Sequence, residues 1–227
     1  MLQQIKDWIV YEGGVFSADD NHFGGDPNAN PRLNLKIQQR PSELSECINF
    51  FIEKKESGEK IEYYAEIGAC SGGTTYAMNQ FLNFKELLII DDGGKENPVY
   101  VSDRGDQLRG ENLSYIPRVE IIGSSAEKRV IEHALNTSNI HKYDILFIDG
   151  DHSYEGVKND TINYMPIVRN GGYIVFHDTH HISGIMNWVS EIPLVCPNLL
   201  LVKDIAKSDE NTSCFPDGIG LTIFQKL

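Results

Sequence analysis

The chain has 227 residues, with 20 Lys and Arg against 33 Asp and Glu, which gives a formal net charge of −13 at pH 7. This length suffices for one large α/β domain with a substantial core, so folding requires neither disulfides nor a structural metal. The acidic balance would repel a phosphate backbone, and no basic stripe interrupts it, so we expect no nucleic-acid partner.

The spacing of the cysteines and the length of the apolar runs indicate the cellular compartment of the protein. The cysteines are scattered without Cys-x-x-Cys spacing, and the N-terminal residues lack the uninterrupted apolar core of a signal peptide. No apolar run approaches the roughly 20 residues that a membrane helix needs. We therefore expect a cytoplasmic protein without a membrane partner.

Residues 1–60 are predicted to form an N-terminal lid and helical extension. Residues 17–34 are rich in turn formers and poor in periodic apolar positions, which is typical of a loop or a lid. Pro41 then opens an amphipathic helix, for which Gly58 provides a stop. We expect the loop around residues 19–34 to close over a bound substrate.

From residue 61 onward, apolar strand patterns alternate with helical patterns, as in a doubly wound sheet. Parallel strands are expected at residues 63–67, 87–90, 119–122, 145–148 and 173–176. The last two runs, residues 199–203 and 220–224, are separated by a polar, turn-rich stretch, which suggests an antiparallel hairpin at the sheet edge. The whole pattern predicts an α/β fold with a mostly parallel sheet.

Two neighbouring strand ends carry acidic and imidazole side chains. Asp149 directly follows one apolar run, and His152 comes shortly after it. His177 and Asp178 directly follow the next run. A helical pattern between the two runs makes the strands parallel through a right-handed crossover. Ligands collect beyond the carboxyl ends of such strands, so we expect these four side chains to share one pocket.

A glycine-rich turn follows the first strand. It reads Glu66-Ile-Gly68-Ala-Cys70-Ser-Gly72-Gly73-Thr74, and glycines in such a turn let the backbone approach a ligand closely. A dinucleotide fingerprint needs glycine where Cys70 stands, so that pyrophosphate can reach the helix N-terminus. The turn therefore argues against a dinucleotide, but it is compatible with a nucleoside that lacks phosphates.

Two further strand ends complete a pattern typical of nucleoside binding. Asp91 follows the second run and can accept hydrogen bonds from both hydroxyls of a ribose. Ser125 lies in a small polar turn after the third run, where it could line an adenine slot. Each feature alone also has a structural explanation, as tight packing, a solvated strand end or a helix cap. Their order at three successive strand ends favours a nucleoside pocket.

Four motifs thus follow one another along the chain, namely Glu66-x-Gly68-x-x-x-Gly72, Asp91, Ser125 and Asp149. In this order they resemble the class I S-adenosylmethionine-dependent methyltransferases. The resemblance implies a Rossmann-like, doubly wound, mostly parallel seven-stranded sheet with a C-terminal antiparallel hairpin strand, formed by residues 61–227. The stretches around Asp149 and His177 resemble a bacterial group with macrolide-sugar O-methyltransferases and cephalosporin-hydroxylase-like proteins, and more distantly the catechol and caffeoyl-CoA O-methyltransferases.

The resemblance implies S-adenosyl-L-methionine as the cofactor. By position in the family, Glu66, Gly68 and Thr74 would hold its methionine part. Asp91 would bind the ribose, and Ser125 the adenine. The full set of expected cofactor contacts is Glu66, Gly68, Gly72, Thr74, Asp91, Ser125 and Asp149. The acceptor implied is a hydroxyl of a small molecule, above all a sugar or a polyhydroxylated metabolite, and a homodimer is expected of such enzymes.

The resemblance also implies a divalent metal, either Mg²⁺ or Mn²⁺. Asp149 would bind it, with His177 and Asp178 as the other protein ligands. The catechol and caffeoyl-CoA relatives have Asp-Asn at this pair and the sugar-modifying ones have two acids, so His177 replaces an oxygen ligand with a nitrogen. Nitrogen matches magnesium less well than manganese, iron or zinc, and a purely orienting role for His177 stays open.

Asp149 and His152 are the predicted catalytic residues. His152 stands where the catechol and caffeoyl-CoA relatives carry a lysine thought to act as general base. An imidazole titrates near neutrality and can take a proton from a hydroxyl whose pKa a metal has lowered. A histidine that bonds only to backbone at a helix start is the alternative for His152.

Two other functions stay open at this point. Asp149-Gly-Asp151 matches the Asp-x-Asp motif with which many glycosyltransferases hold a metal and a nucleotide-sugar, although this interpretation leaves the glycine turn unexplained. A nucleoside-binding protein without turnover would keep the same pocket, and His177 in an oxygen-ligand position is the hint for it. Binding of S-adenosylhomocysteine rather than a nucleoside diphosphate would exclude the glycosyltransferase, and measured methyl transfer would exclude the inactive protein.

Overall fold

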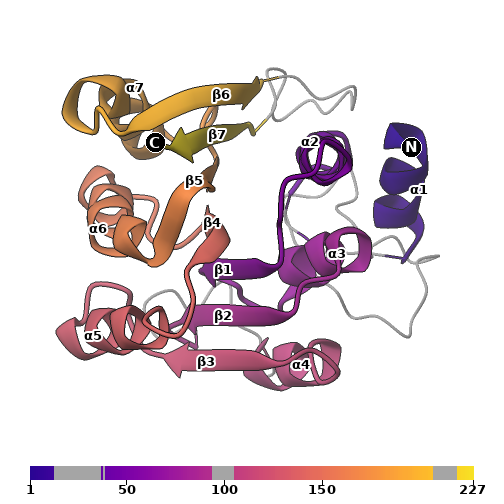
Figure 1. Ribbon diagram of the computed structural model, residues 1–227, viewed down its shortest axis with the longest axis horizontal. Helices are drawn as coiled ribbons and strands as arrows, with labels where there is room; N and C mark the ends of the chain where they lie inside the picture. The colour runs from indigo at the N-terminus through magenta and orange to yellow at the C-terminus, as the bar shows by residue number, and fades with distance from the viewer. Residues whose placement is uncertain (13–36, 38, 94–104, 207–218) are drawn as a thin grey trace.

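Seven strands form one sheet in the computed structural model, which describes residues 1–12, 37, 39–93, 105–206 and 219–227. The strands are β1 Tyr63–Ile67, β2 Glu86–Asp91, β3 Arg118–Ile122, β4 Tyr143–Ile148, β5 Val168–His177, β6 Leu199–Ile205 and β7 Leu221–Lys226. Their order across the sheet is β3-β2-β1-β4-β5-β7-β6 (Figure 1). Each strand overlaps the apolar run that predicted it.

The strand directions confirm the predicted Rossmann-like α/β sheet. The pairs β1–β2, β1–β4, β2–β3 and β4–β5 are parallel, whereas β7 is antiparallel to both β5 and β6. From β3 at one edge the chain returns to place β4 beside β1. The strand order therefore reverses between β1 and β4, and open α/β sheets bind their ligands at such a switch point.

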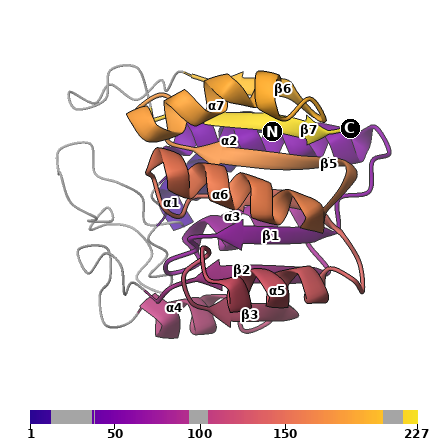
Figure 2. The same ribbon diagram turned by 90° about the vertical axis from the view of Figure 1, so that its left-hand side faces the viewer.

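Helices cover both faces of the sheet (Figures 1 and 2). One face carries α1 Leu2–Glu12, α2 Pro41–Glu56, α3 Gly73–Leu82 and α4 Gly105–Asn112. The other face carries α5 Lys128–Thr137, α6 Tyr154–Tyr164, the 3-10 turn Met165–Ile167 and α7 Ser183–Val195. Among the described helices, none combines the length and the apolar character that crossing a membrane requires.

Alternate side chains of the central strands enter two hydrophobic cores. Along β4, Ile145 and Phe147 pack with the helices of the α1–α3 layer, whereas Leu146 and Ile148 pack with those of the α5–α7 layer. This alternation is expected of a strand that is buried on both faces. Both faces of β4 are thus filled with apolar groups, and polar side chains gather where the strand ends.

The N-terminal extension shares the core of the sheet. Ile9 of α1 and Leu44 and Phe51 of α2 belong to the same buried cluster as Tyr64 of β1. The described part of the extension therefore packs directly on the sheet. The predicted lid at residues 17–34 lies outside the described residues, and the division of the chain after residue 60 stays a prediction.

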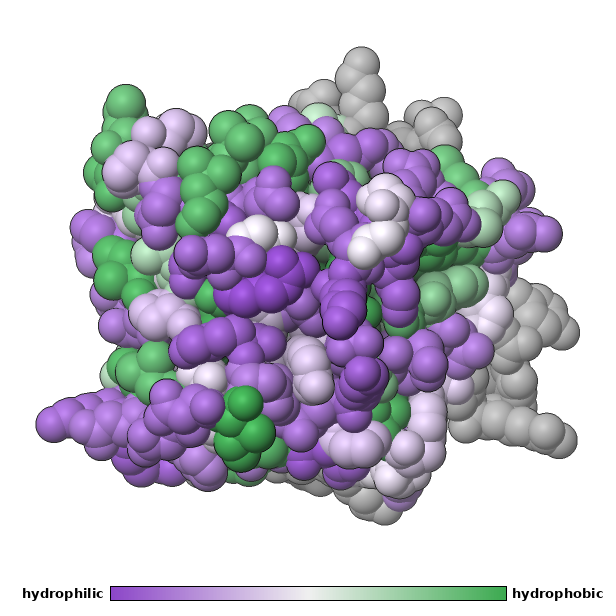
Figure 3. All heavy atoms as spheres, in the orientation of Figure 1, coloured by the Kyte–Doolittle hydropathy of each residue, from purple (hydrophilic) through white to green (hydrophobic). Residues whose placement is uncertain are grey.

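The face shown in Figure 3 is largely polar, with apolar side chains gathered at its upper left, in the region that α7 and β6 occupy in Figure 1. The exposed large apolar residues of these two elements are Met186, Leu194, Val195, Leu200 and Leu201. Because β6 is an edge strand, its outer backbone groups have no strand partner within the sheet. Apolar surface is therefore left open at this end of the described structure.

Candidate active site at the carboxyl ends of the central strands

The glycine turn after β1 touches the tip of β4. The Asp149 N–H donates to the Ile67 carbonyl over 2.9 Å, and a Cβ added to Gly68 would lie 2.0 Å from the Asp149 carbonyl oxygen. Gly68 also has a φ of +84°, a conformation that residues with a side chain rarely adopt. Only glycine therefore fits here, and it brings the two halves of the predicted site into direct contact.

Glu66 is buried near the end of β1. Its carboxylate accepts hydrogen bonds from the Tyr64 hydroxyl, over 2.8 Å, and from the Thr75 hydroxyl. Burial raises the pKa of Glu66 to about 8, although these two hydrogen bonds act to lower it. The Glu66 side chain is thus held by one hydroxyl from β1 and one from α3, the helix that follows the glycine turn.

Asp91 is held at the end of β2 by three donors. It accepts the backbone N–H groups of Cys70 and Gly93, each over 2.8 Å, and its Oδ1 lies 3.3 Å from Nη1 of Arg109. Cys70 has a φ of 48°, so this non-glycine residue adopts the left-handed conformation that lets its N–H reach Asp91. Burial raises the pKa of Asp91, against the lowering effect of Arg109. Asp91 and the glycine turn therefore form one hydrogen-bonded unit.

Arg109, a residue that sequence reasoning missed, is the buried cation beside Asp91. Its Nε donates to Glu120 over 2.7 Å, and its Nη1 donates to the Cys70 carbonyl. The guanidinium from α4 therefore connects β2, β3 and the glycine turn. The segment around Arg109 has a weak sequence pattern, and no local motif marks this arginine.

Ser125 and Gly72 lie at the same edge of the sheet as Asp91. Ser125 is half-buried in the turn after β3, and the Gly123 N–H holds that turn beside β2 by donating to the Asp91 carbonyl over 2.9 Å. Gly72, with a φ of +80°, precedes α3 at a point where a Cβ would meet Cγ of Arg109 at 3.2 Å. Both residues thus border the region where the sequence predicts the cofactor.

The hydroxyl of Thr74 donates to Oε1 of Gln39, and Nε2 of Gln39 donates to Oδ2 of Asp149 over 2.8 Å. Gln39 is 1% exposed and directly precedes the residue before α2. An N-terminal residue therefore lies between the glycine turn and the tip of β4. Sequence reasoning missed Gln39, because no local pattern signals a contact with a residue 110 positions away.

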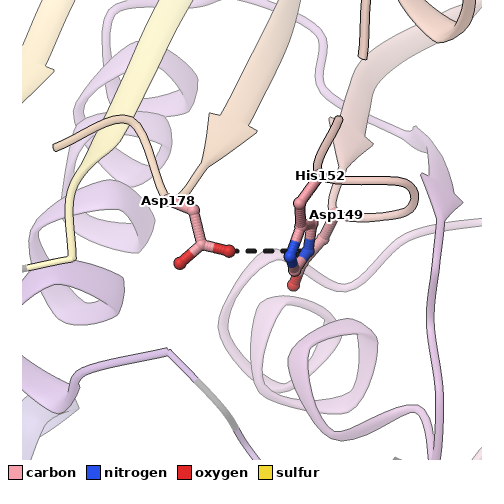
Figure 4. A group of neighbouring side chains, drawn as sticks. All are labelled: Asp149, His152 and Asp178. Atoms are coloured by element: carbon pink, nitrogen blue, oxygen red, sulfur yellow. Dashed lines mark hydrogen bonds and ion pairs between the residues drawn. The ribbon is translucent and has the colours of Figure 1, made fainter. Parts of the chain in front are cut away.

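Asp149, His152, His177 and Asp178 form one acid–imidazole cluster at the tips of β4 and β5. Oδ1 of Asp149 lies 3.0 Å from Nδ1 of His177 and 3.3 Å from Nε2 of His152. Oδ2 of Asp178 lies 3.4 Å and 3.5 Å from the same two nitrogens. Figure 4 shows Asp178 facing Asp149 and His152 from a separate strand. The structure thus brings together the four side chains that the strand-end pattern placed in one pocket.

Burial distinguishes the two imidazoles of the cluster. The side chain of His177 is 4% exposed, whereas that of His152 is 36% exposed. Burial acts to lower the pKa of His177, but the carboxylates of Asp149 and Asp178 raise it well above its usual value. Burial likewise acts to raise the pKa of Asp149, but His177 and His152 hold it below its usual value. His152 is therefore the imidazole of the cluster that is accessible to solvent or to a bound substrate.

The donor set of the cluster suits a divalent cation. Ligand atoms of Asp149, His152 and Asp178 all lie within 4.8 Å of one another. Among the described residues this group contains His152 rather than the predicted His177, whose Nδ1 instead pairs with Oδ1 of Asp149 at 3.0 Å and with Oδ2 of Asp178 at 3.4 Å. Two carboxylates with one nitrogen match manganese, iron or zinc better than magnesium.

Asp151 lies apart from this cluster. Its Oδ1 accepts the Ser153 N–H over 2.8 Å, just before α6 begins, and the residue is exposed. Among the described residues, it does not belong to the group whose atoms could share a metal ion. The two carboxylates of Asp149-Gly-Asp151 therefore face different surroundings, which weakens the glycosyltransferase interpretation.

Comparisons with known proteins bear on the family. Residues 65–179 match the model of a family described as a methyltransferase domain, a span that runs from β1 to just beyond β5. The uncharacterized protein R132 of Acanthamoeba polyphaga mimivirus is 30% identical over 160 residues, which cover 69% of this chain and 69% of that protein. The matched span contains the carboxyl ends of β1 to β5.

Solved structures share the fold at low sequence identity. A Staphylococcus aureus protein assigned as a caffeoyl-CoA O-methyltransferase superposes with a TM-score of 0.58 at 14% identity, covering 84% of this chain and 85% of that one. The O-methyltransferase NovP superposes with a TM-score of 0.59 at 15% identity, covering 99% of this chain and 97% of that one. The fold is therefore shared along most or all of the chain.

The close contact at Gly68 predicts a large loss of stability on substitution. Gly68→Ala should lower the free energy of unfolding by about 2 to 5 kcal/mol, because a strained backbone is combined with a clash against the Asp149 carbonyl. Gly58→Ala is the matched control, since Gly58 has a φ of +97° but nothing within 4 Å of the added Cβ. It should lose only about 1 to 2 kcal/mol. Urea denaturation measures both, and equal losses would contradict the contact.

The raised pKa of Glu66 predicts a pH-dependent stability. Its folded pKa of about 8 exceeds the ordinary value of 4.5, so between these values the folded state holds a proton that the unfolded state has lost. This group alone should therefore lower the free energy of unfolding by up to about 1.4 kcal/mol per unit as the pH rises from about 5 to about 8. Glu66→Gln removes the titration and should flatten that slope. Denaturation across this range measures it, and an unchanged slope in the variant would refute the raised pKa.

Proposed function

We propose that this chain, which by its family match belongs to the class I S-adenosylmethionine-dependent methyltransferases, transfers the methyl group to a hydroxyl oxygen of a small molecule with the help of a divalent cation. The acid–imidazole cluster carries this proposal, because it adjoins the glycine turn through the contact of Gly68 with the Asp149 backbone. A hydroxyl must lose its proton during O-methylation, and the cluster offers groups that can accept one.

The cofactor would lie along the tips of β1, β2 and β3. The Asp91 carboxylate would bind the ribose hydroxyls, and its donors, which include Arg109, keep it from rotating away. Ser125, one strand further along, would border the adenine. The methionine part would lie over the glycine turn beside Asp149, with its contacts drawn from Glu66, Gly68, Gly72 and Thr74. The turn would thereby hold the methyl donor at attack distance from the acceptor.

The cation would be held by Asp149, Asp178 and His177, and when bound it would lower the pKa of an acceptor hydroxyl. His152 is proposed as the general base, because it is the more exposed imidazole and its Nε2 lies 3.3 Å from Oδ1 of Asp149. The negative charges of Asp149 and Asp178 would stabilise the imidazolium that forms. The proton would then leave through the open side of His152.

We further propose that the acceptor is a sugar or another polyhydroxylated metabolite. The net charge of −13 disfavours nucleic acid and other polyanionic acceptors. The S. aureus protein and NovP are O-methyltransferases by name, which is compatible with oxygen as the accepting atom. A homodimer acting in the cytoplasm belongs to the same proposal, and the apolar residues left open on α7 and β6 are compatible with such an assembly.

Calorimetric titration of S-adenosylhomocysteine tests the cofactor half of the proposal. Wild-type protein should bind it, and Asp91→Asn should bind it at least about 10-fold more weakly, because a charged ribose acceptor is lost. The variant keeps the shape of the side chain, which limits the disturbance of the glycine turn. Metal-dependent binding of UDP in place of S-adenosylhomocysteine would favour the glycosyltransferase instead.

Methyl transfer to a panel of sugars, polyols and catechols tests the chemistry. EDTA should abolish the formation of S-adenosylhomocysteine, and Mn²⁺ or Mg²⁺ should restore it. Asp178→Asn should lower kcat/KM by at least about 100-fold and leave the affinity for S-adenosylhomocysteine within about threefold. His152→Gln should lower kcat while Mn²⁺ still binds, whereas loss of Mn²⁺ binding would make His152 a ligand rather than the base. Activity that EDTA does not change would refute the role of the cation.

A further inference from the structure

The side chain of Gln39 lies inside the candidate active site, although this residue belongs to the N-terminal extension. Its Nε2 donates to Oδ2 of Asp149 over 2.8 Å, and its Oε1 accepts the hydroxyl of Thr74. Thr74 is in the first turn of α3, next to the glycine turn, and Asp149 directly follows β4. Gln39 therefore joins the cofactor side of the site to its acid–imidazole side.

The chemistry of the two partners requires a carboxamide at this position. An ionised carboxylate only accepts hydrogen bonds, so the NH₂ group of Gln39 must face Asp149. The amide oxygen is then left for Thr74, whose hydroxyl can donate. Glutamate would lack the donor, and an apolar side chain would lack both groups. One glutamine side chain thus satisfies two buried partners, one in the first turn of α3 and one at the end of β4.

Gln39 gives the two oxygens of Asp149 different partners. Oδ2 receives Gln39, and Oδ1 is left to face Nδ1 of His177 at 3.0 Å and Nε2 of His152 at 3.3 Å. The terminal torsion of an aspartate is broad and roughly two-fold, so it does not by itself decide where each oxygen points. The hydrogen bond from Gln39 fixes this torsion together with the contacts of the two imidazoles at Oδ1.

The backbone that carries Gln39 is itself well anchored. Arg40 is extended and caps the start of α2, where Pro41 occupies the first turn. Leu44 and Ile48 of α2 are fully buried in the core beneath β1. Gln39 therefore lies one residue before the N-cap of a packed helix, so the backbone that follows it is held in place, which helps to keep the geometry of its side chain precise.

We propose that Gln39 is a positioning residue for methyl transfer. It fixes the Asp149 carboxylate so that Oδ1 faces the imidazoles of the cluster that would hold the cation, and through Thr74 it ties that carboxylate to the turn that would hold the methyl donor. This inference rests on the proposed function, because it assigns Gln39 a task within that reaction. It also makes the N-terminal extension a component of the catalytic unit rather than a removable cover.

The variant Gln39→Met keeps the approximate size of the side chain and removes both hydrogen bonds. Calorimetry should show an affinity for Mn²⁺ about 10-fold lower than that of wild type, and kcat should fall by about 10- to 100-fold. The acceptor KM and the affinity for S-adenosylhomocysteine should stay within about threefold. Asn49→Ala is the matched control on α2, where the Asn49 side chain bonds to Glu53 at the surface. It should match wild type in all four quantities.

A double-mutant cycle with Thr74→Val separates positioning from general structural damage. If Gln39 acts through the chain Thr74–Gln39–Asp149, the losses in kcat and Mn²⁺ affinity of the two variants should be clearly non-additive. Additive losses accompanied by a lower Tm would overturn the inference. So would a Gln39→Met variant with the kcat and Mn²⁺ affinity of wild type, and that result would leave the proposed function intact. Wild-type protein that neither binds Mn²⁺ nor transfers a methyl group would overturn the proposed function, and the inference with it.

Discussion

The contact between the tips of β1 and β4 is the constraint on which the rest of the site depends. The Asp149 N–H donates a hydrogen bond to the Ile67 carbonyl. The Asp149 carbonyl lies so close to Gly68 that a side chain at position 68 would clash with it. Because the strand order reverses between these two strands, the glycine turn and the acidic tip cannot separate without disrupting the sheet. The glycine turn and the acid–imidazole cluster are thus held together by backbone.

Buried charge is compensated in the same way on both sides of that contact. Asp91 is paired with Arg109, and Asp149 lies against His177, so neither carboxylate is buried alone. An uncompensated buried carboxylate would be strongly destabilising, whereas a paired one is held in a defined orientation. The pairing leaves His152 as the most exposed polar group of the cluster. A site that removes a proton requires an accessible base, and here the buried carboxylates are paired while the imidazole of His152 is exposed.

Local pattern was sufficient to predict the sheet and most of the residues at its edge. The strands of the sheet are short apolar runs, and such runs mark strands that helices cover on both faces. Asp91, Asp149 and the pair His177 and Asp178 come at the ends of these strands, so the geometry of a parallel sheet places them at one edge. The glycine turn could be recognised by its composition, since a glycine-rich stretch that follows a strand and precedes a helix allows close approach of backbone.

The sequence by itself therefore determined the strands of the sheet and the side chains at their ends. Only the tertiary structure decided that Arg109 and Gln39 belong to the site, because their bonds to Cys70 and Asp149 span 39 and 110 positions of the chain. Periodicity encodes which face of an element is buried, but it carries no information on which distant side chain will pack there. The same limit applies to the two imidazoles, because no local pattern records that the side chain of His177 is 4% exposed whereas that of His152 is 36% exposed.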